Sequence, residues 1–435
     1  MLWTRPQQKA RSGSAGHDVT ELTVPEPGQA AAEAFVKAHL AHLVVGPIRG
    51  STAFRGGQKA ANAALVHFDL TGYATRRNEV YPATRRGASR LSPYIRHGLL
   101  SLPDVWAATA HGPTPDVNKF HDELLWQEFA RHWYARLGHR TARGVRRVQS
   151  PKQSVGPAWD RSMACIDVSI DELESDGWLV NQARMWLASQ WAVRSGSSWS
   201  EGEDVFFRHL LDGSRAANRL GWQWTSGVGS SKHYGFSRWQ VNKRAPGLCD
   251  RCGHREACPI EQWPDDPMFG PPEQSAQPMD GDPTQIAGPQ HELRNREPDT
   301  VWLTAESLGD SDPALMAYPD LPAVFVFDEP LLQRLQLSAK RLVFLTETLA
   351  EIATQTQLTI LVGDPVAMLG EGRSTDQAAG NSHGEHLAVT FAPVPGFRSR
   401  AEAIRPAAVL PWPWLVQPAP GSVSSFSAWR KSVVR

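Results

Sequence analysis

Long apolar runs, excess charge and cysteine are all scarce in this chain of 435 residues. No run of eighteen apolar residues occurs, which excludes a typical transmembrane helix, and the start of the chain lacks the apolar core of a signal peptide. Lysine plus arginine equals aspartate plus glutamate at 45 each, so nucleic-acid binding would depend on a local basic patch. The 4 cysteines are too few for a disulfide scaffold. We therefore expect a cytoplasmic protein without a membrane segment.

Composition and periodicity divide the chain into four parts. Residues 1–35 are polar and contain glycine and proline, which predicts a disordered tail. Apolar residues recur at helical spacing through 36–263, which predicts an all-helical domain. Residues 264–299 are rich in Pro, Gly, Asp and Gln and read as a linker. In 300–435, short apolar runs alternate with helical stretches, which predicts a smaller, abbreviated domain with a doubly wound parallel sheet.

Four segments of the helical part combine polar and aromatic residues on one helical face. They are ASRLSPYIRHG (88–98), ELLWQEFARHW (123–133), GWLVNQARMWLAS (177–189) and LDGSRAANRLGWQW (211–224). Such faces suit a buried planar cofactor better than a plain apolar core. Taken singly, each polar residue could equally form an ordinary buried ion pair or a helix cap.

The cysteines form a compact pattern. Cys249, Cys252 and Cys258 follow a Cys-x2-Cys-x5-Cys spacing, and Cys165 lies upstream. Thiolates at short spacing suit a four-iron cluster or tetrahedral zinc, and metal-free thiols are the third alternative. His254 is an additional ligand candidate in the zinc case.

In their order and spacing, the four segments resemble the flavin-binding helical domain of the photolyase/cryptochrome family. That family shows a TSRLSPYL-like loop, an ELxWREF-like helix, a GWMHNRVRM-like helix and a DGDLAxNxxGWQW-like turn. The resemblance extends from about Gly56 to Trp263. VWLTAESLGDSDPAL (301–315) and VFVFDEPLL (324–332) are similar to the Rossmann-like antenna domain of the same family. That domain comes first in the family, so the resemblance implies a circular permutation here.

The cysteine pattern resembles the iron–sulfur branch of bacterial cryptochromes and photolyases. In that branch one cysteine precedes the helix that begins near GW (177–178), and three follow the flavin turn. The segment SSKHY (230–234) is also similar to an SKPY segment of that branch. The resemblance implies a 4Fe–4S cluster on Cys165, Cys249, Cys252 and Cys258.

The resemblance implies FAD as the cofactor. Arg184 would pair with Asp212 beside the isoalloxazine ring, and Asn218 would face its reactive nitrogen. Ala88, Gln127, Ser214 and Gln182 each replace a hydroxyl or a charge of the family pattern, which would weaken flavin affinity or retune its redox potential. The complete set of expected FAD contacts is Tyr73, Ser89, Arg90, Leu91, Ser92, Gln127, Trp178, Asn181, Arg184, Asp212, Gly213, Ser214 and Asn218.

The residues that match the family's contacts to a pyrimidine dimer are Glu123, Trp126, Asn181 and Met185. A carboxylate accepts hydrogen bonds from pyrimidine N–H groups and an indole offers a stacking face, once the damaged bases have been flipped out of the duplex. Val180 stands where the (6-4) branch usually has histidine, so cyclobutane dimers are favoured over (6-4) photoproducts. The family splits the dimer by electron transfer from excited reduced FAD.

Trp222 and Trp199 match the inner electron-transfer tryptophans of the family. The candidates for a third member, by proximity in sequence only, are Trp186, Trp191 and Trp159. The alternative for Trp199 is that it merely fills a gap between helices.

Arg77 and Gln182 match family positions that contact DNA or the lesion. Two basic clusters, at 76–86 and 140–152, suit a phosphate backbone. A solvated surface is the alternative, above all for the second cluster.

The leading hypothesis is a blue-light-driven photolyase that acts as a monomer on damaged DNA. Alternatives are a cryptochrome-like photoreceptor without repair activity, a (6-4) photolyase, and a non-catalytic binding module that has kept the fold. An antenna chromophore is also expected from the resemblance, but its identity cannot be read from the sequence.

Overall fold

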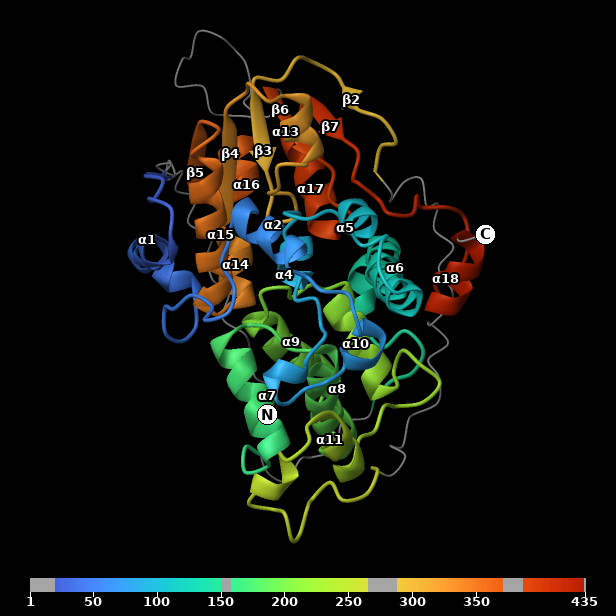
Figure 1. The fold of residues 1–435 in the computed structure, drawn as a ribbon. Helices are drawn as coiled ribbons and strands as arrows, with labels where there is room; N and C mark the ends of the chain where they lie inside the picture. The colour runs from blue at the N-terminus through green and yellow to red at the C-terminus, as the bar shows by residue number, and fades with distance from the viewer. Residues whose placement is uncertain (1–19, 150–157, 265–287, 371–385, 434–435) are drawn as a thin grey trace, which may run out of the picture.

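The computed structural model describes residues 20–149, 158–264, 288–370 and 386–433. Helices make up one half of the molecule and a seven-stranded sheet with its own helices the other half (Figure 1). This arrangement confirms the predicted mixture of helical and parallel-sheet structure. No helix among these residues is both long and apolar enough to span a membrane.

The helical half is built around the long helix α6, with proline in its first turn and a positive-φ glycine, Gly138, just after its end. Proline loses no hydrogen bond in a first turn, and glycine adopts the left-handed conformation that ends many helices, as Gly227 does after α10. The helices are α2 (Gln58–Val66), α3 (Tyr73–Arg76), α4 (Ser92–Arg96), α5 (Leu102–Ala108), α6 (Thr114–Leu137), α7 (Ala164–Ser175), α8 (Asn181–Ser189), α9 (Trp199–His209), α10 (Ala217–Ser226) and α11 (Arg238–Arg244).

The sheet has the strand order β1-β5-β4-β3-β6-β7-β2, in which the five central strands are parallel and the two edge strands antiparallel. Parallel strands covered on both faces consist of continuous apolar runs, as AVFVF in β4 does. The strands are β1 (Thr20–Leu22), β2 (Leu293–Arg294), β3 (Thr300–Leu303), β4 (Ala323–Asp328), β5 (Leu358–Gly363), β6 (Leu387–Thr390) and β7 (Ala408–Leu410).

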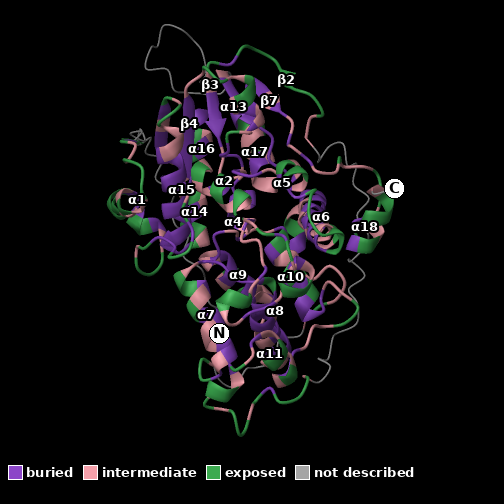
Figure 2. Cartoon of the chain, viewed as in Figure 1, coloured by how far each residue is buried: buried purple, intermediate pink, exposed green. Residues whose placement is uncertain are grey.

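The helices of this half are α1 (Gln29–Phe35), α13 (Pro313–Ala317), α14 (Glu329–Leu335), α15 (Ala339–Ile352), α16 (Pro365–Leu369) and α17 (Pro395–Ile404), whereas α18 (Phe426–Val433) packs on α6 of the helical half. Helix α15 is buried along most of its length (Figure 2), including polar residues that face the helical half. Its Glu347 and Thr348 accept hydrogen bonds from the amides of Gly56 and Gly57. One hydrophobic core continues through both halves, because Phe344 of α15 packs on Tyr94.

Two of the predicted boundaries are wrong. Within the expected tail 1–35, residues 20–22 form β1 against β5, and α1 packs on α15 with Ala32 and Phe35 buried. Within the expected linker 264–299, residues 293–294 form β2 against β7. Edge strands this short carry no periodicity that composition could reveal. The remainder of both segments, residues 1–19 and 265–287, lies outside the described residues.

Candidate functional site

A cavity of about 410 Å³ lies beside the loop that contains Ser89 and Arg90. Three aromatic side chains and several charged ones line it, so it suits a ligand that combines a planar base with phosphate. Two of the expected FAD contacts are therefore cavity residues. The aromatic and charged lining residues are Phe54, Phe68, Tyr94, His67, Asp69, Arg76, Arg86 and Arg90.

Arg90 connects this loop to the start of α8. Its φ of 60° is unusual for a residue with a side chain, and such conformations cluster at functional sites. Its guanidinium lies 4.7 Å from the centre of the Phe54 ring and 5.4 Å from that of Trp178. The Trp178 indole nitrogen donates to Ser92 Oγ over 3.0 Å. Trp178 and the loop are thus held as one unit.

Two other expected FAD contacts lie in the core. Tyr73 packs edge-to-face on Phe120 at 5.0 Å, and its burial raises the pKa of the phenol. The Leu91 side chain is fully buried and its amide donates to Ser89 Oγ. Leu91 therefore supports the loop from inside.

Arg184 and Asp212 form a bidentate ion pair, with N–O distances of 3.2 and 2.7 Å. Arg184 Nε also donates to the carbonyl of Leu179 at 2.9 Å. The Asp212 carboxylate is almost completely buried, so the pair is stronger and less screened than a surface ion pair. It joins α8 to the turn before α10.

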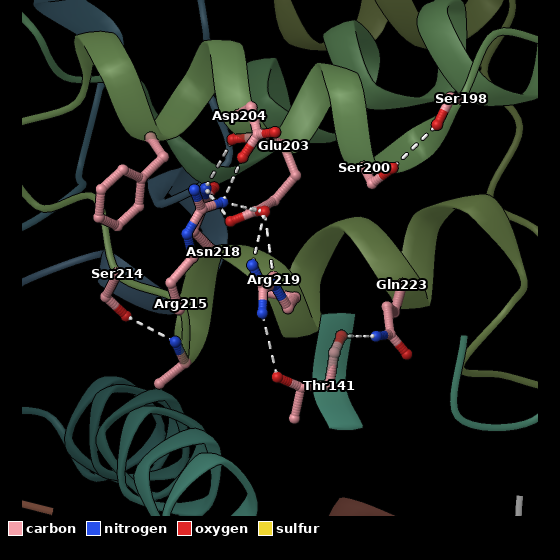
Figure 3. Close-up of polar contacts among 12 residues, drawn as sticks. Thr141, Ser198, Ser200, Glu203, Asp204, Ser214, Arg215, Asn218, Arg219 and Gln223 are labelled. Atoms are coloured by element: carbon pink, nitrogen blue, oxygen red, sulfur yellow. Dashed lines mark hydrogen bonds and ion pairs between the residues drawn. The ribbon is translucent and has the colours of Figure 1, made fainter. Parts of the chain in front are cut away.

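Asn218 belongs to a polar network that the sequence analysis missed (Figure 3). Its amide nitrogen is 3.4 Å from both the main-chain carbonyl and the carboxylate of Glu203 on α9. Arg215 and Arg219 both pair with this carboxylate. Burial raises the pKa of Glu203, while the two guanidinium groups lower it. The amide nitrogen of Asn218 is thereby committed to Glu203.

A signal for this network existed in the sequence. Glu203 is one helical turn after Trp199, and two arginines flank Asn218 at one and three residues. In contrast, Ser214 caps the start of α10, because its hydroxyl accepts hydrogen bonds from the amides of Ala216 and Ala217.

The face of α6 with Glu123 and Trp126 is only half-buried. Glu123 pairs with Lys119 at 2.9 Å and with Arg77 at 3.2 Å. Trp126 is stacked on Phe426 of α18, with ring centres 4.0 Å apart and planes inclined by 14°. One face of the Trp126 indole is therefore covered by the end of the chain.

The other two expected dimer contacts lie on α8, where Asn181 is exposed and Met185 is half-buried. No hydrogen bond or ion pair between described residues joins them to Glu123. The half-buried Gln127 lies on the same helix as Glu123, one turn further on.

The prediction that Gln182 contacts DNA is wrong for this structure. Its side chain is buried, and its amide nitrogen donates to the Tyr234 hydroxyl over 2.7 Å. The helical register of α8 places this position against the segment that follows α10. Arg77, the other expected DNA contact, is paired with Glu123.

Most arginines of the first basic cluster also have partners. Arg85 pairs with Glu79, and Arg86 with Glu172. In the second cluster, Arg140 and Arg143 are exposed, while Lys152 lies outside the described residues.

Two of the three candidate outer tryptophans, Trp191 and Trp159, follow Trp222 in a series of neighbouring indole rings. A Cβ on Gly202 of α9 would lie 2.2 Å from one atom of the Trp222 ring and 2.9 Å from Trp191, so both indoles pack against this glycine. Trp159 follows, edge-to-face with Trp191 at 4.9 Å. Trp186 instead stacks on Phe236.

Trp199 is buried without an aromatic partner among the described residues. The expected Trp222–Trp199 pair is thus not formed by a direct ring contact.

All four cysteines line one small cavity next to Met163. The amide of Ala164 donates to Cys252 Sγ at 3.4 Å. Burial, followed by the neighbouring thiols, raises the pKa of Cys165 to about 12. Within the described ranges, no three His, Cys, Asp or Glu side chains converge on a single-ion site.

Comparison with known proteins places the similarity in the helical half. Residues 120–246 match the family model described as the FAD binding domain of DNA photolyase. A deoxyribodipyrimidine photo-lyase of Thermus thermophilus is 35% identical over 186 residues, which cover 40% of this chain and 43% of the relative. The corresponding protein of Escherichia coli is 32% identical over 191 residues, 40% of each chain.

Among solved structures, a bacterial class III photolyase from Agrobacterium tumefaciens is 28% identical over 39% of this chain and 38% of its own, with a TM-score of 0.36. The chain thus matches about two fifths of the length of its curated relatives. The similarity to DNA photolyases thus lies in the helical half, where residues 120–246 match an FAD-binding domain.

Proposed function

We propose that this protein is a blue-light-driven flavoprotein that splits cyclobutane pyrimidine dimers in DNA, a deoxyribodipyrimidine photolyase. The observation that carries the proposal is the bidentate Arg184–Asp212 pair, whose carboxylate is almost completely buried, next to the turn that leads to Asn218 and inside the region matched by the FAD-binding model. An ordinary core has little use for an ion pair and a committed amide at neighbouring positions, because buried polar groups are costly.

The chemistry of the donor set fits FAD. The Ser89 hydroxyl with Arg76 and Arg90 would hold the diphosphate. The Arg184–Asp212 pair and Asn218 would hold the isoalloxazine ring. Reduced FAD, when bound and excited, supplies the electron that opens the cyclobutane ring.

On α6 the protein would bind and orient the lesion. Lys119 and Arg77 both pair with the Glu123 carboxylate, which would accept hydrogen bonds from pyrimidine N–H groups. Phe426 covers one face of Trp126, which leaves its other face for stacking on a flipped-out base.

The test is repair of a dimer-containing oligonucleotide under blue light with fully reduced FAD bound. Wild type should restore the intact pyrimidines, and Glu123→Gln should lower the repair yield at least about tenfold because it removes a charged acceptor. The matched control is Glu297→Gln, an exposed glutamate that pairs with Arg294 of β2. Absence of repair by FAD-loaded wild type contradicts the proposal.

A cryptochrome-like photoreceptor is the second candidate. It is favoured by the burial of Gln182 and by the pairing of Arg77 with Glu123, because these are the two side chains expected to contact DNA. It predicts that blue light changes the flavin redox state together with binding of a protein partner, without repair. The structure adds no support for the (6-4) alternative, because the apolar Val180 is fully buried at the position where that branch usually has histidine.

A non-catalytic module with the same fold would show no flavin absorbance after purification or after addition of FAD. One absorption spectrum therefore separates it from both photochemical candidates.

We further propose that Cys165, Cys249, Cys252 and Cys258 hold a 4Fe–4S cluster. The cavity that these four cysteines share, and the resemblance of their spacing to the iron–sulfur branch of the family, support this proposal. Anaerobic purification should yield about four iron atoms and four sulfides per chain. Cys165→Ser should lower the iron content, whereas stoichiometric zinc would refute the assignment.

The family order of domains would be permuted, since the helical half precedes β3 to β7 in this chain. The hydrogen bonds between α15 and the Gly56–Gly57 segment support this proposal. They hold the two domains together whichever domain comes first in the chain. A chain rearranged so that the sheet domain comes first should still fold and bind FAD. An antenna chromophore remains part of the proposal without assigned residues.

A further inference from the structure

The turn between α9 and α10, which carries Asp212, is held by an arginine from the sheet domain. Arg341 of α15 donates to the carbonyl of Phe207, and through Nε at 3.0 Å to that of Leu210. The last carbonyls of a helix have no partner inside it. Arg341 therefore caps the C-terminus of α9, where a positive charge is favoured.

Besides these carbonyl groups, the Arg341 guanidinium lies 4.6 Å from the centre of the Phe207 ring on the same helix. It is only 4% exposed, and no acidic side chain of the described residues pairs with it. Burial lowers the pKa of Arg341 to about 9, so it stays protonated at neutral pH. A buried cation is costly unless it is well hydrogen-bonded. The carbonyls of this turn provide that bonding, and the nearby Asp212 carboxylate favours the charge.

Gly213 makes the close approach of Arg341 possible. A Cβ at this position would lie 2.1 Å from Arg341 Nη2, so any side chain here would force the Arg341 guanidinium to move. The glycine next to Asp212 thus leaves the space in which the Arg341 guanidinium lies.

Two further residues connect the same turn to the sheet domain. Arg96 Nε donates to the Gly213 carbonyl at 3.1 Å, and Arg96 also pairs with Glu306 just after β3. His97 lies between the carbonyls of Leu211 at 3.1 Å and Ala305 at 2.7 Å. The turn is therefore fixed at three points by residues outside the region that matches the FAD-binding model.

We propose that Arg341 is a positioning residue for the cofactor site: the sheet domain sets the geometry of the Asp212 turn, and with it the affinity for FAD. The inference rests on the proposed function as far as FAD is concerned. The effect of Arg341 on the order of the turn does not depend on the proposed function.

The first experiment measures amide hydrogen exchange of peptides spanning 207–214 in the protein without FAD. Arg341→Leu removes the donors and should speed exchange there at least about tenfold. Arg341→Lys, which keeps the charge without the fork, should lie between Arg341→Leu and wild type. The control is Thr348→Val on the same helix, which removes a buried contact to Gly57 and leaves the turn untouched.

The second experiment measures the dissociation constant of FAD for the same proteins. Arg341→Leu should weaken binding about tenfold or more, and Thr348→Val less than about twofold. Unchanged exchange of the turn in Arg341→Leu overturns the inference, and so does exchange that increases equally in the control. Wild type that fails to bind FAD refutes the proposed function but leaves the exchange result interpretable. If Arg341→Leu does not fold, the test depends on Arg341→Lys. The inference is then overturned if Arg341→Lys has the same exchange rate at the turn and the same FAD affinity as the wild type.

Discussion

The turn with Asp212 and the α6 face with Glu123 and Trp126 are both supported by the last third of the chain, in different ways. At the turn, cationic side chains donate to main-chain carbonyl groups, and the Asp212 carboxylate that pairs with Arg184 is only 6% exposed. At the α6 face, support comes from one aromatic stack and ion pairs that remain partly exposed. Buried charge-assisted contacts tolerate little change, whereas exposed pairs contribute little. The cofactor end is thus expected to be rigid and the substrate end adaptable.

The largest effect is expected from Arg184→Leu at the turn. The substitution leaves the Asp212 carboxylate buried without its partner, which should lower the free energy of unfolding by about 3 kcal/mol. Urea unfolding monitored by circular dichroism measures this quantity. A loss below about 1 kcal/mol would mean that water reaches Asp212 and that the turn resembles the α6 face.

Phe426→Ala is the corresponding test of the α6 face. Phe426 is buried against Trp126, Phe129 and Trp429, so its loss should cost about 2–3 kcal/mol, confined to the docking of α18. Exchange of α18 amides should increase while that of the Asp212 turn stays at the wild-type level. Phe426→Leu, which keeps most of the volume, should cost less than about 1.5 kcal/mol. Increased exchange at both sites would remove the contrast between them.

The turn should also be the pH-sensitive region. Burial, with smaller contributions from Arg96 and Arg341, lowers the pKa of His97 to about 3. The unfolded chain therefore binds a proton near pH 6.5 while the folded protein does not, and stability falls as the pH drops from about 6.5 towards 3, by at most about 1.4 kcal/mol per unit.

Urea unfolding at pH 7, 6 and 5 measures this slope. His97→Gln should flatten it, and the exposed His139→Gln should leave it as in wild type. An identical slope in all three proteins would show that other groups dominate the acid response.

The smallest effect is expected from Arg430→Ala, which breaks the ion pair with Asp122 at the edge of the α6 face. The arginine side chain is 46% exposed, so the loss should be about 0.5 kcal/mol and should shrink at high salt. A loss above about 2 kcal/mol would mean that α18 is held electrostatically rather than by aromatic packing.

The sequence alone determined the local elements and the chemistry they carry. Helical periodicity defined α6, continuous apolar runs defined the parallel strands, and the order of four motifs singled out Arg184, Asp212 and Asn218. These properties depend on neighbours a few residues apart, so they can be recognised from the sequence alone.

Only the tertiary structure decided which distant segments meet. It placed Arg341 on the Asp212 turn, Phe426 on Trp126 and β1 beside β5, and it turned Gln182 inwards. Such contacts join residues up to several hundred positions apart, and they follow from how the helices and the sheet pack against each other. No local pattern encodes that packing, because the same periodicity allows a helix face to meet many partners.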